Sequence, residues 1–129
     1  MNNNITGNVK DDRFAKYVGI ELVEVREGYA VAELIVRDDH LNGVNSVQGG
    51  AIFTLADYAF AAASNSYGFV TVGINVNISY FKAPSGKKIR AVAKEVSTQN
   101  RICGYDVDLL DEDGSIFARF NGLGYIKRK

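Results

Sequence analysis

The sequence predicts an α+β fold in which one antiparallel sheet curls around a single long helix. An alanine-rich run of about fifteen residues, from Gly50 to Asn65, has the length of a helix rather than of a strand. Five or six other segments alternate apolar and polar residues, as strands do. Short turns join most of them, so neighbouring strands are expected to be antiparallel. We expect one domain over residues 1–129, with residues 1–10 as a flexible N-terminal segment.

The local patterns place the elements in order. Asp11 or Asp12 is expected to cap a short helix that carries Phe14, Tyr17 and Val18 on one side. The alanine-rich helix is surrounded by apolar residues and should be buried on most sides. Before this helix we expect strands over 20–26 and 29–36, joined by a turn at 27–28, and then a polar loop over 37–48. After it we expect a strand over 70–80 with one polar face and a strand over 88–96. Two further strands, around 103–109 and 116–120, are joined by a turn at 111–114.

The composition argues against several other classes of protein. Fifteen basic and fifteen acidic residues give zero net charge, whereas nucleic-acid binding needs an excess of cations. The single Cys excludes an intrachain disulfide, and one Cys with one His excludes the common zinc signatures. The N-terminus lacks the order of a signal peptide, and the most apolar stretch is too short to span a bilayer. We therefore expect a cytoplasmic protein with no metal and no membrane or nucleic-acid partner.

Charged residues are distributed unevenly along the chain. Of the 41 residues from 41 to 81 only Asp57 is charged, where the chain average of 23% predicts about nine. A long stretch without charges is usually interior, so a lone carboxylate within it needs a reason. The thirteen residues from Lys82 to Lys94 then hold five cations and no acid, a patch that would suit a phosphorylated ligand.

The start of the alanine-rich helix carries residues that suit carbonyl chemistry. The preceding loop offers Asn42 and Gln48, and the backbone N–H groups of Gly49 and Gly50 lie at the helix N-terminus. Such groups lack intrahelical partners and stabilise developing negative charge, as in an oxyanion hole. Two turns later Asp57 lies among apolar residues, where a carboxylate suits the role of general base or nucleophile.

One chain alone does not bring these groups together. Asp57 lies roughly 10 Å along the helix from Gly50, too far to reach a carbonyl held at its own helix start. A homodimer would bring Asp57 of one chain to Gly49 of the other. Because a small domain with an exposed sheet edge often pairs with a copy of itself, we expect a homodimer.

The segment from His40 to Gly50 (HLNGVNSVQGG), followed by six residues and Asp57, resembles the motif of the PaaI-type hotdog-fold acyl-CoA thioesterases. The segment 75–81 and the break at 84–86 follow the same order, so the resemblance covers residues 12 to 127. It implies a sheet wrapped around a long helix and a dimer or dimer of dimers with active sites at the subunit interface. It also implies hydrolysis of an acyl-CoA thioester without a cofactor.

The resemblance further implies a role for each candidate residue. Asp57 activates water or attacks the thioester, the Gly49 amide with Gln48 polarises the carbonyl, and Asn42 helps to place substrate or water. The residues expected to bind coenzyme A, with the cations meeting its phosphates, are Tyr80, Lys82 and Arg101.

The sequence departs from the family pattern at two positions. Gln48 stands where the family usually has His, and an amide keeps a donor but cannot carry a proton at neutral pH. Gly73 stands where some relatives have a Ser or Thr that faces the carboxylate. Thr71 and Asn75 are the two candidates to replace that hydroxyl.

Alternative interpretations of the same residues stay open. Gln48 in place of His favours a non-catalytic acyl-CoA-binding protein, whereas Asp57 favours an enzyme. A hotdog-fold dehydratase is a third alternative, but dehydration would need a histidine base. In a purely structural interpretation, Asp57 is a buried residue that is hydrogen-bonded to a neighbouring strand, and Asn42 is an ordinary loop residue. We expect His40 to be a solvated loop residue and Cys103 to belong to the core.

Overall fold

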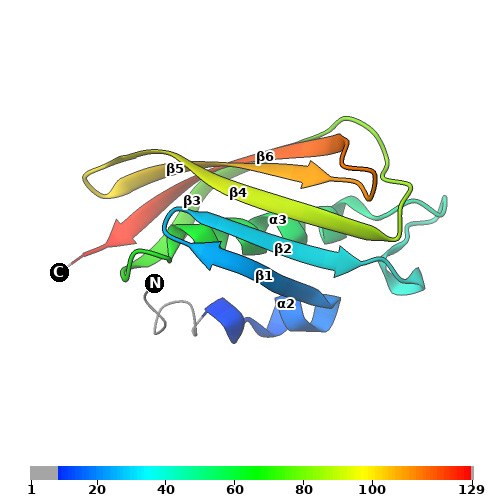
Figure 1. The fold of residues 1–129 in the computed structure, drawn as a ribbon, viewed down its shortest axis with the longest axis horizontal. Helices are drawn as coiled ribbons and strands as arrows, with labels where there is room; N and C mark the ends of the chain where they lie inside the picture. The colour runs from blue at the N-terminus through cyan, green and yellow to red at the C-terminus, as the bar shows by residue number, and fades with distance from the viewer. Residues whose placement is uncertain (1–8, 129) are drawn as a thin grey trace.

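The computed structural model describes residues 9–128, so residues 1–8 of the segment expected to be flexible lie outside the description. One six-stranded antiparallel sheet lies against the long helix α3, which contacts every strand of it (Figure 1). The strand order is β1-β2-β4-β5-β6-β3. The arrangement confirms the expected α+β hotdog architecture. In chain order the elements are α2 (Arg13–Val18), β1 (Ile20–Arg26), β2 (Tyr29–Ile35), the 3-10 helix η1 (Asp38–His40), α3 (Gly49–Ser64), β3 (Val70–Tyr80), β4 (Lys88–Gln99), β5 (Ile102–Leu110) and β6 (Ile116–Lys127).

The short helix α2 begins at one of its two predicted caps. The Asp12 carboxylate caps it by accepting a hydrogen bond from the Ala15 N–H at 2.9 Å. Ala15 and Val18 are buried, whereas Phe14 and Tyr17 are 62% and 78% exposed. All three predicted residues, Phe14, Tyr17 and Val18, line one groove, which confirms that they lie on one side of this helix.

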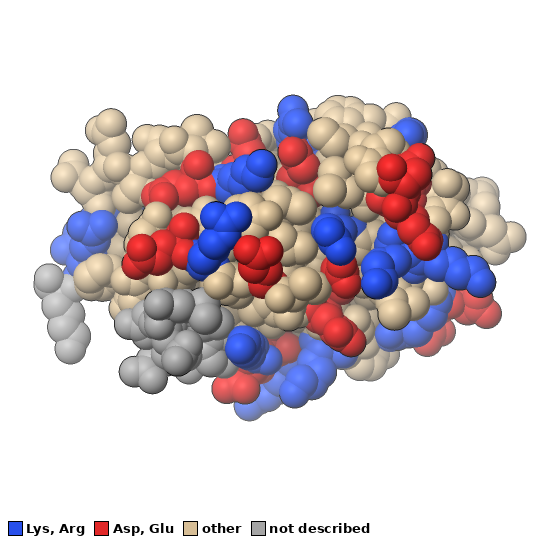
Figure 2. All heavy atoms as spheres, in the orientation of Figure 1, with Lys and Arg blue, Asp and Glu red and all other residues tan. Residues whose placement is uncertain are grey.

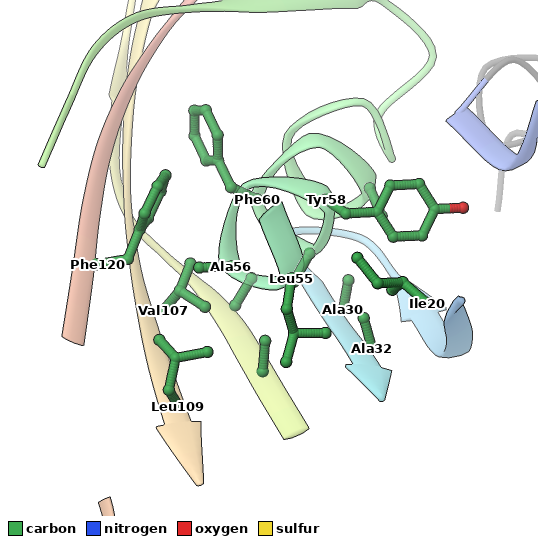
Figure 3. Packing of buried hydrophobic residues seen from close by; sticks show 14 of the residues in the cluster. Ile20, Ala30, Ala32, Leu55, Ala56, Tyr58, Phe60, Val107, Leu109 and Phe120 are labelled. Atoms are coloured by element: carbon green, nitrogen blue, oxygen red, sulfur yellow. The ribbon is translucent and has the colours of Figure 1, made fainter. Parts of the chain in front are cut away.

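The core lies between α3 and the sheet because small residues on the central strands let the helix approach closely. Fully buried alanines alternate along β2 and β4, and Leu55 projects from α3 toward those on β2 (Figure 3). Tyr58 points away to one side near Ile20, and Phe60 points to the other side beside Phe120. The four alanines on these strands are Ala30, Ala32, Ala91 and Ala93.

Strand β3 contains a β-bulge that reverses which of its residues face α3. Its pairing with β6 shifts register between Gly73 and Asn75. Before the bulge the odd position Thr71 pairs with buried Ile126, and after it the even position Ile78 pairs with buried Phe120. The expected regular alternation over the whole strand is therefore wrong. The reversal leaves the apolar residues of the first half exposed: Val70, Val72 and Ile74.

Cations from the 82–94 segment are interspersed with acids from neighbouring strands. Lys88 and Arg90 both form ion pairs with Glu33 of the adjacent strand β2. Figure 2 shows the same mixture of positive and negative side chains across the face in view. A purely cationic patch, as expected from this segment alone, is therefore wrong. No helix within residues 9–128 has the length and apolar character needed to cross a membrane.

Candidate active site

Gln48 caps the start of α3 and leaves one glycine N–H available. Its backbone is extended, and its side-chain Oε1 accepts a hydrogen bond from the Gly50 N–H. Among the hydrogen bonds of residues 9–128, none uses the Gly49 N–H or the Gln48 side-chain NH2. The helix start therefore has two donors, on adjacent residues, that are free to bind a ligand oxygen.

Tyr80, predicted to bind coenzyme A, lies directly against this helix start. Its hydroxyl donates a hydrogen bond to the Gly49 carbonyl oxygen at 2.9 Å. A Cβ added at Gly49 would lie 3.1 Å from the hydroxyl oxygen and 3.2 Å from the adjoining ring carbon. A Cβ at Gly49 would displace the ring by a few tenths of an ångström, so glycine favours the close contact between Tyr80 and the start of α3.

Asn42 holds the loop that precedes the helix. Its Oδ1 accepts hydrogen bonds from the backbone N–H groups of Val44 at 3.0 Å and Ser46 at 3.1 Å. The carbonyl side of the amide is therefore committed to a turn. Its NH2 group makes no hydrogen bond among the described residues and stays available for a substrate or water.

Asp57 faces a hollow of about 340 Å³ between α3 and the bulge of β3. Among residues 9–128 its carboxylate forms no hydrogen bond and no ion pair, which argues against the structural alternative of a carboxylate bonded to a strand. Burial first, and the charge of Asp12 second, raise the pKa of Asp57 above the ordinary value. The other residues lining the hollow are Phe53, Gly73, Ile74, Asn75 and Val76.

The two candidates to replace the missing hydroxyl lie on different parts of β3. Asn75 lines the hollow beside Gly73, whereas Thr71 lies farther along the strand in another cavity. Thr71 is buried, and its hydroxyl has no partner among the described residues. After the bulge the odd positions face away from α3, and Asn75 also lines a cavity on that outer face with Asn77 and Asn121, so neither candidate is placed beside the Asp57 carboxylate.

A single chain keeps Asp57 apart from the helix start. Gln48 and Gly50 line a separate groove of about 820 Å³ between α2, the 37–48 loop and α3. Of all the residues that line these two spaces, only Phe53 lines both. The i, i+4 spacing of Phe53 to Asp57 places the two side chains on one side of the helix.

The three residues predicted to bind coenzyme A lie at two ends of the molecule. Lys82 follows Tyr80 at the end of β3, and its Nζ lies 3.1 Å from the Ser115 hydroxyl. Arg101, in the turn between β4 and β5, donates to the Arg128 carbonyl oxygen at 2.9 Å. Since Arg128 lies beyond the β6 end that pairs with Val70, the length of β3, about 33 Å, separates the two positions.

The lone histidine is structural. His40 is 5% exposed; its Nδ1 accepts from the Arg37 N–H at 3.0 Å and its Nε2 donates to the Val18 carbonyl oxygen at 2.7 Å. The prediction of a solvated loop residue is wrong because this ring ties α2 to the loop, and with both nitrogens engaged it is not free to serve as a base. Cys103 is buried, which confirms its expected place in the core.

Comparisons with known proteins define the class. Residues 45–118 match the model of the thioesterase superfamily, and the chain belongs to this superfamily. It is 39% identical to a protein of Archaeoglobus fulgidus over 117 residues, which cover 90% of this chain and 76% of that protein. The prediction of a thioester-hydrolysing enzyme is thereby confirmed.

The individual relatives agree with the PaaI-type resemblance. The chain is 32% identical to the acyl-coenzyme A thioesterase PaaI of Escherichia coli, over 90% of this chain and 84% of that protein. The structure of Escherichia coli PaaI superposes with a TM-score of 0.91 and 29% identity, covering 98% of this chain and 92% of that one. A Thermus thermophilus structure gives a TM-score of 0.83 at 34% identity, with 88% and 97% covered.

Proposed function

We propose that this protein hydrolyses the thioester of an acyl-CoA, with Asp57 as the catalytic carboxylate. The observation that carries the proposal is an unpaired, partly buried carboxylate facing a hollow on the helix whose start presents free N–H donors. A purely structural carboxylate would have a hydrogen-bonding partner, since an unpaired buried charge destabilises the fold. The similarity to an acyl-coenzyme A thioesterase supports the choice of substrate.

In the proposed reaction, the oxygen of a water molecule bonds to the thioester carbonyl carbon and the carbon–sulfur bond breaks. Asp57 accepts the proton of that water, and the proton then passes to the departing thiolate, so the products are a carboxylic acid and free CoA. The route in which Asp57 attacks the carbonyl first gives the same products through an acyl–aspartyl intermediate. Both routes use the ionised carboxylate, and neither requires a cofactor.

The start of α3 stabilises the negative charge that develops on the carbonyl oxygen. The Gly49 N–H and the Gln48 NH2 supply the two donors, and the positive end of the helix dipole adds to them. The cap between Gln48 and Gly50 holds the amide group in the required orientation. Glutamine replaces the usual histidine here without loss of a donor, because the step assigned to this position needs orientation rather than proton transfer.

The complete site requires a second copy of the chain. Strand β3 is an edge strand of eleven residues that contains no charged side chain, and such an edge favours pairing. Two-fold pairing of β3 edges sets the two strands antiparallel and turns the start of one α3 toward the Asp57-bearing half of the other. The same pairing brings the partner's Arg101 toward Tyr80 and Lys82, which gathers the proposed contacts to coenzyme A.

Release of free thiol from a panel of acyl-CoAs tests the proposal. Wild-type protein is expected to turn over at least one of them, and Asp57→Asn to lower kcat by about 10²-fold or more. Asp106→Asn is the matched control, because Asp106 lies on the outer face of the sheet, bonded to Asn121 at 2.6 Å. Equal turnover by Asp57→Asn would remove Asp57 from the mechanism. Tight binding of CoA without hydrolysis would favour the non-catalytic acyl-CoA-binding protein.

A further inference from the structure

A second cavity lies at the opposite end of α3 from Gln48. It measures about 330 Å³. Polar groups along it bond to one another, since the Tyr67 hydroxyl donates to the Glu95 carboxylate at 2.6 Å and the Thr98 hydroxyl donates to the same group. Its most deeply buried lining residues are Ser64, Thr71, Cys103, Tyr105 and Ile126.

This distal cavity and the Asp57 hollow lie along one stripe of α3. Asp57, Phe60 and Ser64 are spaced i, i+3 and i+7, so their side chains project from the same side of the helix. Asp57 lines the hollow and Ser64 lines the distal cavity. Seven residues, about 10 Å of helix, separate the two spaces. Phe60 is the large side chain between them.

The Phe60 ring lies between residues that line the two spaces. It is 2% exposed and lies on glycines 73, 122 and 124, where an added Cβ would be 3.3, 3.0 and 3.5 Å from a ring atom. Gly73 lines the Asp57 hollow. On the other side the ring meets Tyr105, a wall of the distal cavity, with centroids 5.7 Å apart. Figure 3 shows Phe60 beside Phe120 in this position.

We infer that Phe60 is the specificity-determining residue that closes the acyl pocket and limits the substrate to short-chain or single-ring acyl groups. The inference rests on the proposed function, because it treats the Asp57 hollow as the place where the acyl group begins. A longer alkyl chain meets the buried ring before it reaches the distal cavity. Replacing the ring by a small side chain joins the two spaces along the helix and provides a longer apolar pocket.

Hydrolysis and binding are measured on the full chain with Phe60→Ala, the milder Phe60→Leu, and Phe117→Leu as the control. Phe117 is as buried as Phe60 but packs neither on Gly73 nor against the Tyr105 ring. The ratio of kcat/KM for dodecanoyl-CoA to that for butanoyl-CoA is expected to rise about tenfold or more in the Phe60 variants and to stay unchanged in the control. Adding Ser64→Leu to Phe60→Leu refills the distal cavity and should remove the gain.

Binding of S-butyl-CoA and S-dodecyl-CoA thioethers, measured by calorimetry, separates this inference from the proposed function. These probes cannot be hydrolysed, so Phe60→Leu should bind the dodecyl probe about tenfold more tightly than wild type even where turnover is absent. An unchanged dodecyl-to-butyl ratio in folded Phe60→Leu, in both measurements, would overturn the inference. Efficient hydrolysis of dodecanoyl-CoA by wild type would overturn it as well. Absence of turnover on every acyl-CoA would instead contradict the proposed function.

Discussion

The hydroxyl of Tyr80 donates a hydrogen bond to the carbonyl oxygen of Gly49, 2.9 Å away, and so joins the last residue of β3 to the first residue of α3. The contact is close, because even a Cβ at Gly49 would meet the tyrosine ring. The sheet edge proposed to pair with a second copy thus also positions the residue whose N–H is proposed to bind the carbonyl oxygen.

Tyr80→Phe removes this hydrogen bond and keeps the ring. A neutral hydrogen bond contributes about 1 kcal/mol, so we expect a loss of stability of that size and a fall in kcat/KM of about threefold to tenfold. Thermal unfolding and thiol release measure the two effects. Tyr125→Phe, on the exposed face of β6, is the control and should change neither. Wild-type activity in Tyr80→Phe would show that this contact does not position Gly49 for catalysis.

Two substitutions at Gln48 separate its capping role from its catalytic role. Gln48→Ala loses both the cap and the donor, and should cost about 1 kcal/mol of stability and about 10²–10³ in kcat. Gln48→Glu keeps an acceptor for the Gly50 N–H at the positive end of the helix, so its stability should match that of wild type. Its activity should still fall as far as that of Gln48→Ala, and full activity in Gln48→Glu would contradict the donor role.

Asn42 allows the same kind of separation. Asn42→Asp retains the oxygen that accepts from Val44 and Ser46, whereas Asn42→Ala removes it. We expect the aspartate variant to unfold at the wild-type temperature and the alanine variant to lose about 1 kcal/mol. If the NH2 group places substrate or water, both variants lose activity. Full activity of Asn42→Asp would show that Asn42 holds the loop and does not place substrate or water.

The raised pKa of Asp57 predicts opposite effects of pH on activity and on stability. Hydrolysis needs the ionised carboxylate, so kcat/KM should fall as the pH is lowered. The midpoint of that fall should lie at a higher pH than it would for an aspartate with an ordinary pKa. The folded chain holds this proton more tightly than the unfolded chain, so ionisation of Asp57 costs stability as the pH rises through the shifted pKa. Asp57→Asn should therefore unfold at a higher temperature than wild type at neutral pH, and at the same temperature under acid conditions where Asp57 is protonated. A variant less stable than wild type at neutral pH would contradict the unpaired state of the carboxylate.

Local sequence patterns were sufficient to place most elements of the fold. The strand 70–80 and the strand 20–26 have the predicted bounds, and Asp12 is one of the two predicted caps of α2. These features depend on neighbouring residues alone: alternation for the strands, and a side-chain acceptor for the cap.

Features that depend on distant residues could not be predicted in this way. The bulge reverses the faces of β3 after Gly73, where Phe60 of α3 packs on the strand. His40 is buried because Val18 of α2 supplies its partner, and Arg90 is paired because β2 places Glu33 beside it. For the candidate site, the motif identified Asp57 and Gly49, while the contact of Tyr80 with Gly49 required the folded chain.

Mixing two inactive variants tests most directly the central claim that one site combines Asp57 of one chain with the helix start of its partner. Asp57→Asn and Gln48→Glu chains, each inactive alone, are unfolded together, refolded and assayed for thiol release. Random pairing leaves one intact site in each mixed dimer, so the account predicts recovery of about a quarter of wild-type activity. A mixture no more active than the separate variants, with mixed dimers detected by native mass spectrometry, would contradict the shared site.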